Sequence, residues 1–391
     1  MVFLNAESSS LKRASITAKQ VLGFDISTNT IERICLDVGS DLELASSQDW
    51  KGVIDGEAIV PQLAIVSYDG GRIRTRQMGQ GPGVHLSGKG WNETKNAIFV
   101  SASSETSEAD PAPTPPKSFF DPAHVARLTE TAKAKENARS DDNIPDKKPK
   151  AKAKKPKSKK PSHKPKRLHR TLISSMKNST EFGKQMAKEA KRRRFGEATR
   201  KAFVGDGLSC NWTIQETHFK DYVAILDFIH GVTYIYRAAL VCFGKCDEAW
   251  TTYTQWMTQA WRGQIGDVLN ALYEHQNRIG IPPKEVCDDD PREQLRVIIG
   301  YLQNNAGRMK YDEYRKQGLP TTSAWMESAV KEINYRVKGT EKFWNNPEGA
   351  EAILQIRAAA LSDDDRLVRL LAHRPGCNTV RRTASKLALA A

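Results

Sequence analysis

The chain has 391 residues, a length that suggests two or three compact units, and its hydrophobic fraction of 39% is low for a single globular body. The formal net charge is +14, but residues 147–170 alone hold 13 Lys or Arg and no acid, so everything else carries only about +1. Six scattered cysteines argue against a disulfide framework and favour a reducing cytosol, and no apolar run reaches the roughly 20 residues that span a bilayer.

Residues 1–50 are predicted to form small helices. The stretch "SLKRASITAKQVL" is amphipathic, "GFDIS" interrupts it, and the next segment places Ile31, Cys35 and Val38 on one helical face. A helix, a short break containing Gly and a second helix outline a possible helix-turn-helix DNA-binding unit. The same pattern suits a plain packing element, and both interpretations stay open.

Residues 61–103 alternate with period two and predict three strands, "PQLAIVSYDG", "GRIRTRQMG" and "TKNAIFVSAS". Gly70-Gly71 is expected to turn the chain between the first two strands, and "QGPGVH" to form the longest turn. These strands open a unit over residues 58–135, which ends in an expected helix beginning "PAHVARLTE".

Arg72, Arg74 and Arg76 alternate along the second predicted strand and therefore share one face of it. That face is either solvated or a track for DNA phosphates, and the residues favour neither interpretation.

Residues 136–170 contain the basic tract. Lys repels Lys, Pro blocks helix formation and no apolar residue is available for burial, so we expect disorder. The tract is either a solubilising linker or, as we favour, an arm that binds duplex phosphates. Its candidate DNA contacts include Lys154, Lys155, Lys159 and Lys160.

Residues 171–230 continue the α/β pattern. A helix is expected over "LISSMKNSTEFGKQMAKEAKRRRF", then a short strand ending at Asp206, then a second strand, "YVAILDFIH", ending at Asp227 and His230. Residues 231–318, rich in Trp, Tyr and Leu, are expected to be all helical.

Residues 319–361 open with "LPTTSAWMESAVKEINYRVKG", in which Pro followed by Thr and Ser is a good helix start. This helix would carry Glu327, Lys331 and Asn334 on one face. The tail, residues 362–391, has little pattern and is expected to fray.

Three carboxylates are candidates for one site. Asp69 and Asp206 end strands, the ends of neighbouring strands lie roughly 5 Å apart, and a helix across the sheet can bring Glu327 to the same point. Converging carboxylates repel one another unless divalent cations lie between them, and a pair of Mg²⁺ about 3.5–4 Å apart suits phosphodiester chemistry. The alternatives are that Asp69 starts a turn, Asp206 caps a helix and Glu327 faces solvent.

Several motifs together resemble one protein family. The segments "AIVSYDGGRIRTR", "FVGDGLSCNWTI", "AILDFIHGVTYIY" and "GLPTTSAWMESAVKEINYRVKGTEKFW" resemble bacterial insertion-sequence transposases of the DDE type, in the mutator-like group. The resemblance spans roughly residues 10–361, and its last segment is the most specific. It implies a ribonuclease-H-like α/β domain, a mixed sheet flanked by helices, with an all-helical insertion before the final Glu.

The resemblance also assigns roles to residues. It makes Asp69, Asp206 and Glu327 the catalytic and metal-binding carboxylates for Mg²⁺ or Mn²⁺, two ions in all. Asp227 and His230 match an Asp-x-x-His spacing, so Asp227 is an alternative second ligand and His230 an accessory residue, unless it is a core histidine. Basic residues close to Glu327 are expected to contact DNA: Lys331, Arg336, Lys338 and Lys342.

The sequence is therefore interpreted as a transposase. Metal-bound water would cleave a strand at the element's terminal repeat, and the freed 3′-hydroxyl would attack target DNA. The expected partners are double-stranded DNA and further copies of the chain, with no membrane, in the bacterial cytoplasm at the nucleoid. The alternatives are a structure-specific metal-dependent nuclease and a catalytically inactive DNA-binding derivative.

Overall fold

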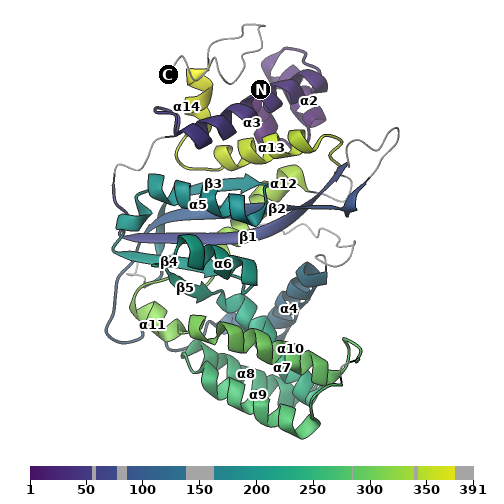
Figure 1. Ribbon diagram of the computed structural model, residues 1–391, viewed down its shortest axis with the longest axis vertical. Coiled ribbons are helices and arrows are strands. Elements are labelled where there is room, and N and C mark those ends of the chain that lie inside the picture. The colour runs from purple at the N-terminus through teal and green to yellow at the C-terminus, as the bar shows by residue number, and fades with distance from the viewer. Residues whose placement is uncertain (55–58, 77–85, 138–162, 284, 339–341, 375–391) are drawn as a thin grey trace.

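The computed structural model describes residues 1–54, 59–76, 86–137, 163–283, 285–338 and 342–374. At its centre is a five-stranded mixed sheet with the strand order β3-β2-β1-β4-β5 (Figure 1). β1, β2 and β3 are successively antiparallel, whereas β4 runs parallel to β1 and β5 parallel to β4. The strands are β1 (Leu63–Arg76), β2 (Leu86–Ser103), β3 (Lys166–Ser175), β4 (Arg200–Gly205) and β5 (Val223–Leu226).

Helices cover both faces of this sheet, which is why the start of β1 is apolar without alternation. On one face α5 (Ser179–Arg192) brings Phe182 to 5.9 Å from the ring of Tyr68 in β1, and α6 (Ser209–His218) packs against α5. On the other face lie α12 (Ala324–Val337) over β1 and β2 and α13 (Pro347–Ala360) over β3. The expectation of a mixed sheet flanked by helices is confirmed.

The predicted turn at Gly70-Gly71 is wrong. Gly70 pairs with Lys95 and Gly71 with Thr94 inside the β1–β2 ladder, so two of the predicted strands are one strand. A Cβ on Gly71 would lie 2.7 Å from Thr94 Oγ1. The glycine therefore permits a close approach of two strands within the sheet. In the sequence alone, a Gly-Gly pair of this kind cannot be told from one that forms a turn.

The prediction of disorder is wrong for the last residues of the basic tract, 166–170, which form the first half of β3. Arg170 pairs with Val100 of β2, and its guanidinium forms an ion pair with Glu332 of α12 at 2.9 Å. Residues 138–162, including the four lysines named above, lie outside the described residues. The helix expected from Leu172 starts only at Ser179, because Leu172–Ser175 complete the strand.

The expected N-terminal helices are present as α1 (Val2–Glu7), α2 (Leu11–Leu22) and α3 (Thr28–Gln48). α3 buries Ile31, Cys35 and Val38 and packs against α13. The expectation of a patternless tail is wrong for α14 (Arg366–His373), which buries Leu367 and Leu370.

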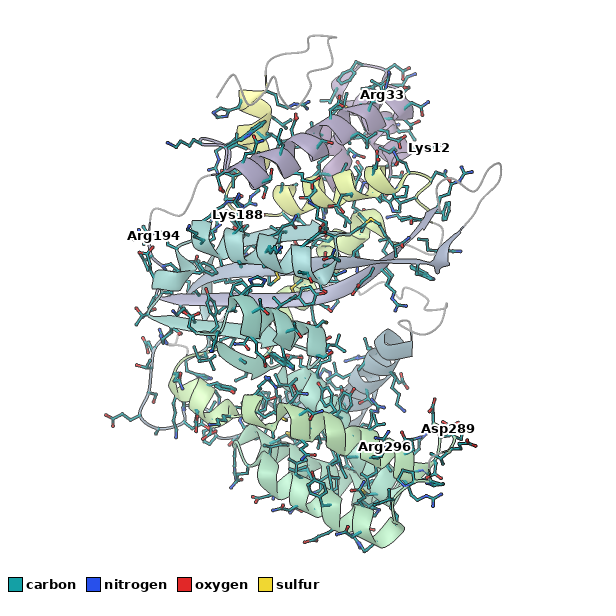
Figure 2. The ribbon with its side chains drawn as sticks, in the orientation of Figure 1. Lys12, Arg33, Lys188, Arg194, Asp289 and Arg296 are labelled. Carbon is teal, nitrogen blue, oxygen red and sulfur yellow. The ribbon has the colours of Figure 1, made fainter. Side chains whose placement is uncertain are left out.

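The predicted all-helical stretch, residues 231–318, contains helices joined by loops and no strand among its described residues. These helices and α4 form the opposite end of the molecule from α1–α3 (Figure 1). We call this end the helical block; it consists of α4 (Pro122–Asn137), α7 (Phe228–Phe243), α8 (Asp247–Trp261), α9 (Ile265–Ile279), α10 (Pro291–Asn305) and α11 (Tyr311–Lys316). Charged side chains at both ends of the molecule face outward, such as Lys12 and Arg33 on the N-terminal helices and Asp289 and Arg296 in the helical block (Figure 2).

Short 3₁₀ turns complete the chain at Lys117–Phe120, Phe195–Glu197 and Ala306–Arg308. Among the described residues, no helix combines the length and the apolar character that crossing a bilayer requires.

Candidate active site around Asp69 and Asp206

The register of two parallel strands brings Asp69 and Asp206 to the same level of the sheet. Ser67 of β1 pairs with Val204 of β4, so each aspartate lies two residues further along its own strand direction. Burial raises the pKa of Tyr68, and the charges of Asp69 and Asp206 raise it further, so both carboxylates lie near this phenol. Two acids that are 137 positions apart in sequence thus meet at one region.

Asp206 is held in a tight turn between β4 and α6. Its Oδ1 accepts hydrogen bonds from the backbone N–H of Leu208 at 3.1 Å and from Asn211 Nδ2 at 2.7 Å. The hydroxyl of Tyr301, on α10, donates to the Asp206 carbonyl at 2.7 Å. One carboxylate oxygen therefore ties Asp206 to Leu208, which is the N-cap residue of α6, and to the side chain of Asn211, and the contacts orient the whole group.

Asp227 is buried with no exposed surface, and both its oxygens accept hydrogen bonds. Oδ1 accepts from the backbone N–H of Ser323 at 2.7 Å, and Oδ2 from that of His230 at 3.1 Å, with His230 Nδ1 at 2.6 Å. Burial raises the pKa of Asp227, but these hydrogen bonds and the charge of His230 outweigh it and hold the pKa below its ordinary value. Asp227 thus joins β5, α7 and the start of α12, which is a positioning role.

Glu327 lies in the first turn of α12, where its N–H bonds to the carbonyl of Ser323 at 3.0 Å. Its side chain is 28% exposed and forms an ion pair with Lys331 at 3.7 Å, whose own side chain is 74% exposed. The hydrogen bond from Ser323 to Asp227 fixes the start of α12 at the end of β5. Glu327 lies one helical turn after Ser323, so its position along α12 is fixed as well.

A row of polar side chains crosses the sheet beneath α12. Asp69 pairs with Asn96 of β2, and Asn96 pairs with Ser174 of β3, whose hydroxyl bonds to Asn96 Oδ1 at 2.7 Å. Asn96 Nδ2 and Asn334 Oδ1 are both buried and have no hydrogen-bond partner among the described residues, and both lie within 4 Å of where a Cβ of Gly71 would be. Such groups are costly to leave unsatisfied in an apolar core, so this row is a candidate place for a bound polar group.

The donor chemistry here fits a hard divalent cation. The carboxylates of Asp69 and Asp206 are oxygen ligands of the type that Mg²⁺ prefers, whereas the contact of Glu327 is with Lys331. Within the part of the chain that the structure describes, no three His, Cys, Asp or Glu side chains converge closely enough to hold one ion. Mg²⁺ is commonly held by one or two carboxylates together with substrate phosphates.

Two of the predicted DNA-contacting residues flank one aromatic ring. The guanidinium of Arg74 lies 5.7 Å from the centre of the Trp91 ring, and Lys338 Nζ lies 5.8 Å from it. Two cations and an indole therefore lie together where the paired residues Arg74 and Trp91 of β1 and β2 approach the C-terminal end of α12. Arg72 and Arg76 lie on the same strand as Arg74.

Other predicted contacts have structural tasks. Arg336 is only 3% exposed and donates to the carbonyl and the side chain of Asn5, in α1. Burial lowers its pKa to about 10, so it stays charged at neutral pH. Lys342 donates to the carbonyls of Tyr335 and Arg336, at the end of α12, where a cation suits the helix dipole.

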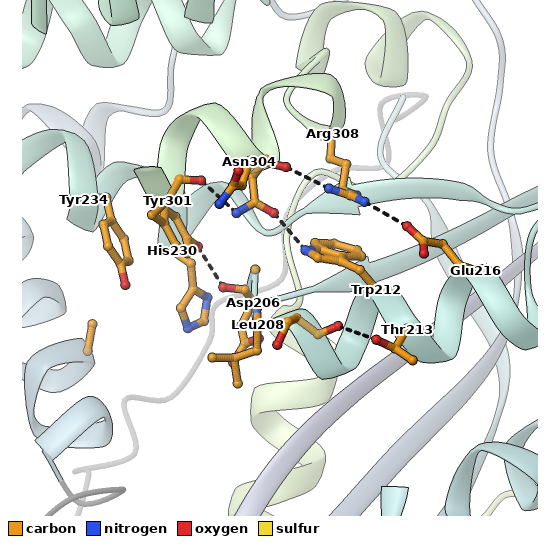
Figure 3. A pocket seen from close by; sticks show the side chains of 14 residues that line it. Asp206, Leu208, Trp212, Thr213, Glu216, His230, Tyr234, Tyr301, Asn304 and Arg308 are labelled. Atoms are coloured by element: carbon orange, nitrogen blue, oxygen red, sulfur yellow. Dashed lines mark hydrogen bonds and ion pairs between the residues drawn. The ribbon is translucent and has the colours of Figure 1, made fainter. Parts of the chain in front are cut away.

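A cavity of about 500 Å³ adjoins this region (Figure 3). Asp206 and His230 line it together with side chains from α6, α7 and α10, and Asp69 and Glu327 are not part of its wall. Tyr301 spans from the cavity to the Asp206 carbonyl.

Sequence reasoning missed Trp91, Asn96 and Tyr301. Each is an ordinary strand or helix residue in its own segment, and each becomes relevant only through a partner far away in the chain: Trp91 through Lys338, Asn96 through Ser174, and Tyr301 through Asp206. No local pattern carries that information.

A scan of the sequence against protein-family models found no match, and a search of curated proteins also returned none.

Proposed function

We propose that the chain is a DNA-cleaving and strand-transferring enzyme, a DDE transposase of the mutator-like group with a ribonuclease-H-like catalytic domain. The observation that carries this proposal is the parallel β1–β4 register, which aligns Asp69 with Asp206. The hydrogen bond from Ser323 to Asp227 adds support, because it ties the first turn of α12, with Glu327, to the neighbouring strand. The mixed sheet with helices on both faces is of the kind that the sequence resemblance implies.

Asp69, Asp206 and Glu327 would hold Mg²⁺ or Mn²⁺, and two such ions supply an activated attacking oxygen and neutralise charge on the phosphate. The chain itself orients these ligands. Leu208 and Asn211 fix Asp206. Asp227 fixes the start of α12 through Ser323.

Arg74 and Lys338, the two cations beside the Trp91 ring, would bind the phosphates of the DNA backbone by charge. The indole of Trp91 would provide an apolar surface next to them. Lys331, exposed one turn after Glu327, would contact a phosphate close to the cleaved bond. The substrates would be double-stranded element ends and target DNA, bound by several copies of the chain at the bacterial nucleoid.

The test is Asp69→Asn in the full chain, assayed for Mg²⁺-dependent nicking of supercoiled plasmid. We expect nicking to fall by on the order of 10²-fold or more, because a neutral amide neither binds nor offsets a divalent cation as a carboxylate does. DNA affinity should change less than about twofold, since phosphate contacts come from cations elsewhere. Asp289→Asn, an exposed acid in the helical block, is the matched control and should nick normally.

Retained nicking in Asp69→Asn would rule out this site. Joined products, in which a cleaved end becomes covalently linked to a second plasmid, distinguish a transposase from a nuclease on the same fold, because a nuclease transfers the phosphate only to water.

A further inference from the structure

One face of α10, continued into the 3₁₀ turn that follows it, holds α6 and the turn before it. Tyr301, Asn305 and Arg308 recur on this face at helical spacing. Asn305 Oδ1 accepts a hydrogen bond from Trp212 Nε1 at 2.8 Å. The guanidinium of Arg308 lies 4.4 Å from the centre of the Trp212 ring and pairs with Glu216 at 3.5 Å (Figure 3). The helical block is therefore joined to α6 by a buried hydrogen bond and by a cation.

Tyr301 extends this contact to Asp206 itself. Its hydroxyl donates to the Asp206 carbonyl at 2.7 Å, the usual length of a hydroxyl hydrogen bond. Its ring stacks on that of Tyr234 from α7, with centroids 3.6 Å apart and planes inclined by 5°. Burial raises the pKa of Tyr301, and the charges of Tyr234 and Asp206 raise it further, so the hydroxyl remains a donor at neutral pH. The stack fixes the ring, and the ring fixes the direction of the donated bond.

Asp206 is thereby restrained at both its main chain and its side chain. Its carbonyl belongs to the peptide that joins it to Gly207, and a glycine gives the backbone more freedom to rotate than any other residue. Its Oδ1 accepts hydrogen bonds from the N–H of Leu208 and from the side chain of Asn211. A carboxylate held in this way loses little freedom when it binds a cation, because its orientation is set before binding.

We propose that Tyr301 is a positioning residue for Asp206, and that the helical block thereby sets how tightly the site at Asp69 and Asp206 binds its divalent cation. Without the Tyr301 hydroxyl, the carboxylate would have to be ordered at the moment of binding. Contacts that orient a ligand from outside typically change metal affinity by about 10- to 100-fold. The role rests on the proposed function, since a cation at Asp69 and Asp206 is what this carboxylate would be positioned for.

Two tyrosines of the helical block make the same kind of bond to different strands, which supplies a matched pair of variants. Tyr301→Phe removes the hydroxyl at Asp206 and keeps the stacked ring. Tyr314→Phe removes a hydroxyl that α11 donates to the carbonyl of Ala224 in β5 at 3.3 Å. Ala224 pairs with Phe203 of β4, three residues before Asp206. Each variant loses one partly buried bond between a hydroxyl and a carbonyl, but only the first loses it at a candidate ligand.

The first measurement is Mn²⁺ binding to the full chain without DNA, followed through the electron paramagnetic resonance signal of free Mn²⁺. Asp69→Asn removes a candidate ligand and so identifies the part of this binding that belongs to the site. For that part, Tyr301→Phe should raise the Kd by about 10-fold, and Tyr314→Phe should leave it within about twofold.

The second measurement is amide hydrogen exchange of the metal-free chain, which does not depend on activity. Amides of residues 207–211 should exchange about 2- to 10-fold faster in Tyr301→Phe, because the turn loses one hydrogen bond. Tyr314→Phe should leave their exchange unchanged.

The role of Tyr301 would be overturned by a Mn²⁺ Kd that Tyr301→Phe leaves unchanged, by an equal rise in both tyrosine variants, or by unchanged exchange over residues 207–211. Absence of any Mn²⁺ binding that Asp69→Asn removes would overturn it too. Failure of the proposed function gives a different result, because Asp69→Asn would then retain nicking whatever Tyr301→Phe does.

Discussion

Gly207 sets the turn between β4 and α6 that presents Asp206. Its φ is +93°, in the region that favours glycine, and a Cβ there would lie 2.4 Å from the Tyr301 hydroxyl. That hydroxyl bonds to the Asp206 carbonyl, so the residue that makes the turn possible also admits the tyrosine that holds it. The candidate site thus depends on a backbone position as well as on its carboxylates.

Gly207→Ala should therefore destabilise the protein by about 1–3 kcal/mol, from backbone strain and displacement of Tyr301. Gly300→Ala is the control, because this helical glycine has nothing within 4 Å of an added Cβ and alanine favours helix by about 0.5–1 kcal/mol. Urea denaturation followed by circular dichroism should show the midpoint falling in the first variant and rising in the second. A midpoint unchanged by Gly207→Ala would mean that the turn is not constrained.

At the scale of elements, a buried network of ion pairs joins α5 to α14. Glu189 accepts from Arg193 at 2.9 Å and from Arg366 at 2.6 Å, and Asp364 pairs with both arginines. Burial raises the pKa of Glu189, but the charges of Arg366 and Arg193 outweigh it and hold the pKa well below its ordinary value. This network adds ion pairs to the apolar contacts through which Leu367 and Leu370 pack α14 on the fold.

Glu189→Gln should cost about 3–5 kcal/mol at pH 7, because it leaves buried arginines short of a counter-charge. A carboxyl whose folded-state pKa is depressed stabilises the fold above its unfolded pKa of about 4.3, and this contribution is lost as the pH falls toward the folded value. The difference in urea midpoint between the two proteins should therefore be full at pH 7 and shrink below about pH 4.

Glu197→Gln is the matched control, since its pair with Arg194 has side chains 55% and 40% exposed and solvent screens such a pair. An equal loss of stability in the two variants would mean that the buried network has no special role.

At the scale of the whole molecule, the N-terminal helices are fastened to the helices around the candidate site. Arg336 of α12 bonds to Asn5, and Arg357 of α13 donates to the carbonyl of Ala6 at 3.0 Å. The sequence of α3 carries four acids and one base, and its apolar face is buried against α13. These features favour the packing interpretation of residues 1–50 over reading of DNA by a helix-turn-helix.

The position of β3 decides how the basic tract should be tested. A deletion to residue 170 would remove half of a strand, whereas residues 147–162 hold nine lysines and end before Lys166, where β3 begins. Replacing 147–162 by a Gly/Ser linker of equal length should weaken DNA binding and flatten its dependence on salt, by about 0.9 in slope for each lysine that neutralises a phosphate. Fluorescence anisotropy between about 50 and 200 mM KCl measures this, and an identical slope would leave the tract as a linker only.

Much of the fold could be predicted from local pattern. Period-two and helical alternation located β1, β2, β4 and β5, the N-terminal helices and the helical block, because each element must bury one face, but it did not locate β3. The predictions failed where a residue's conformation depends on a contact with a distant segment. Gly71 has no side chain because Thr94 of the paired strand leaves no room for one, and residues 166–170 form a strand because β2 offers them hydrogen-bond partners.

The sequence by itself determined which side chains are available: three carboxylates near the ends of elements and a surplus of positive charge in one tract. It also determined which helices and strands have an apolar face. Only the tertiary structure decided which of them meet. It aligned Asp69 with Asp206, enclosed Arg336 against Asn5, and built a cavity from Tyr234, Tyr301 and Trp212. The physical reason is that burial and backbone pairing act between segments far apart in the chain, whereas periodicity reports only on the segment that carries it.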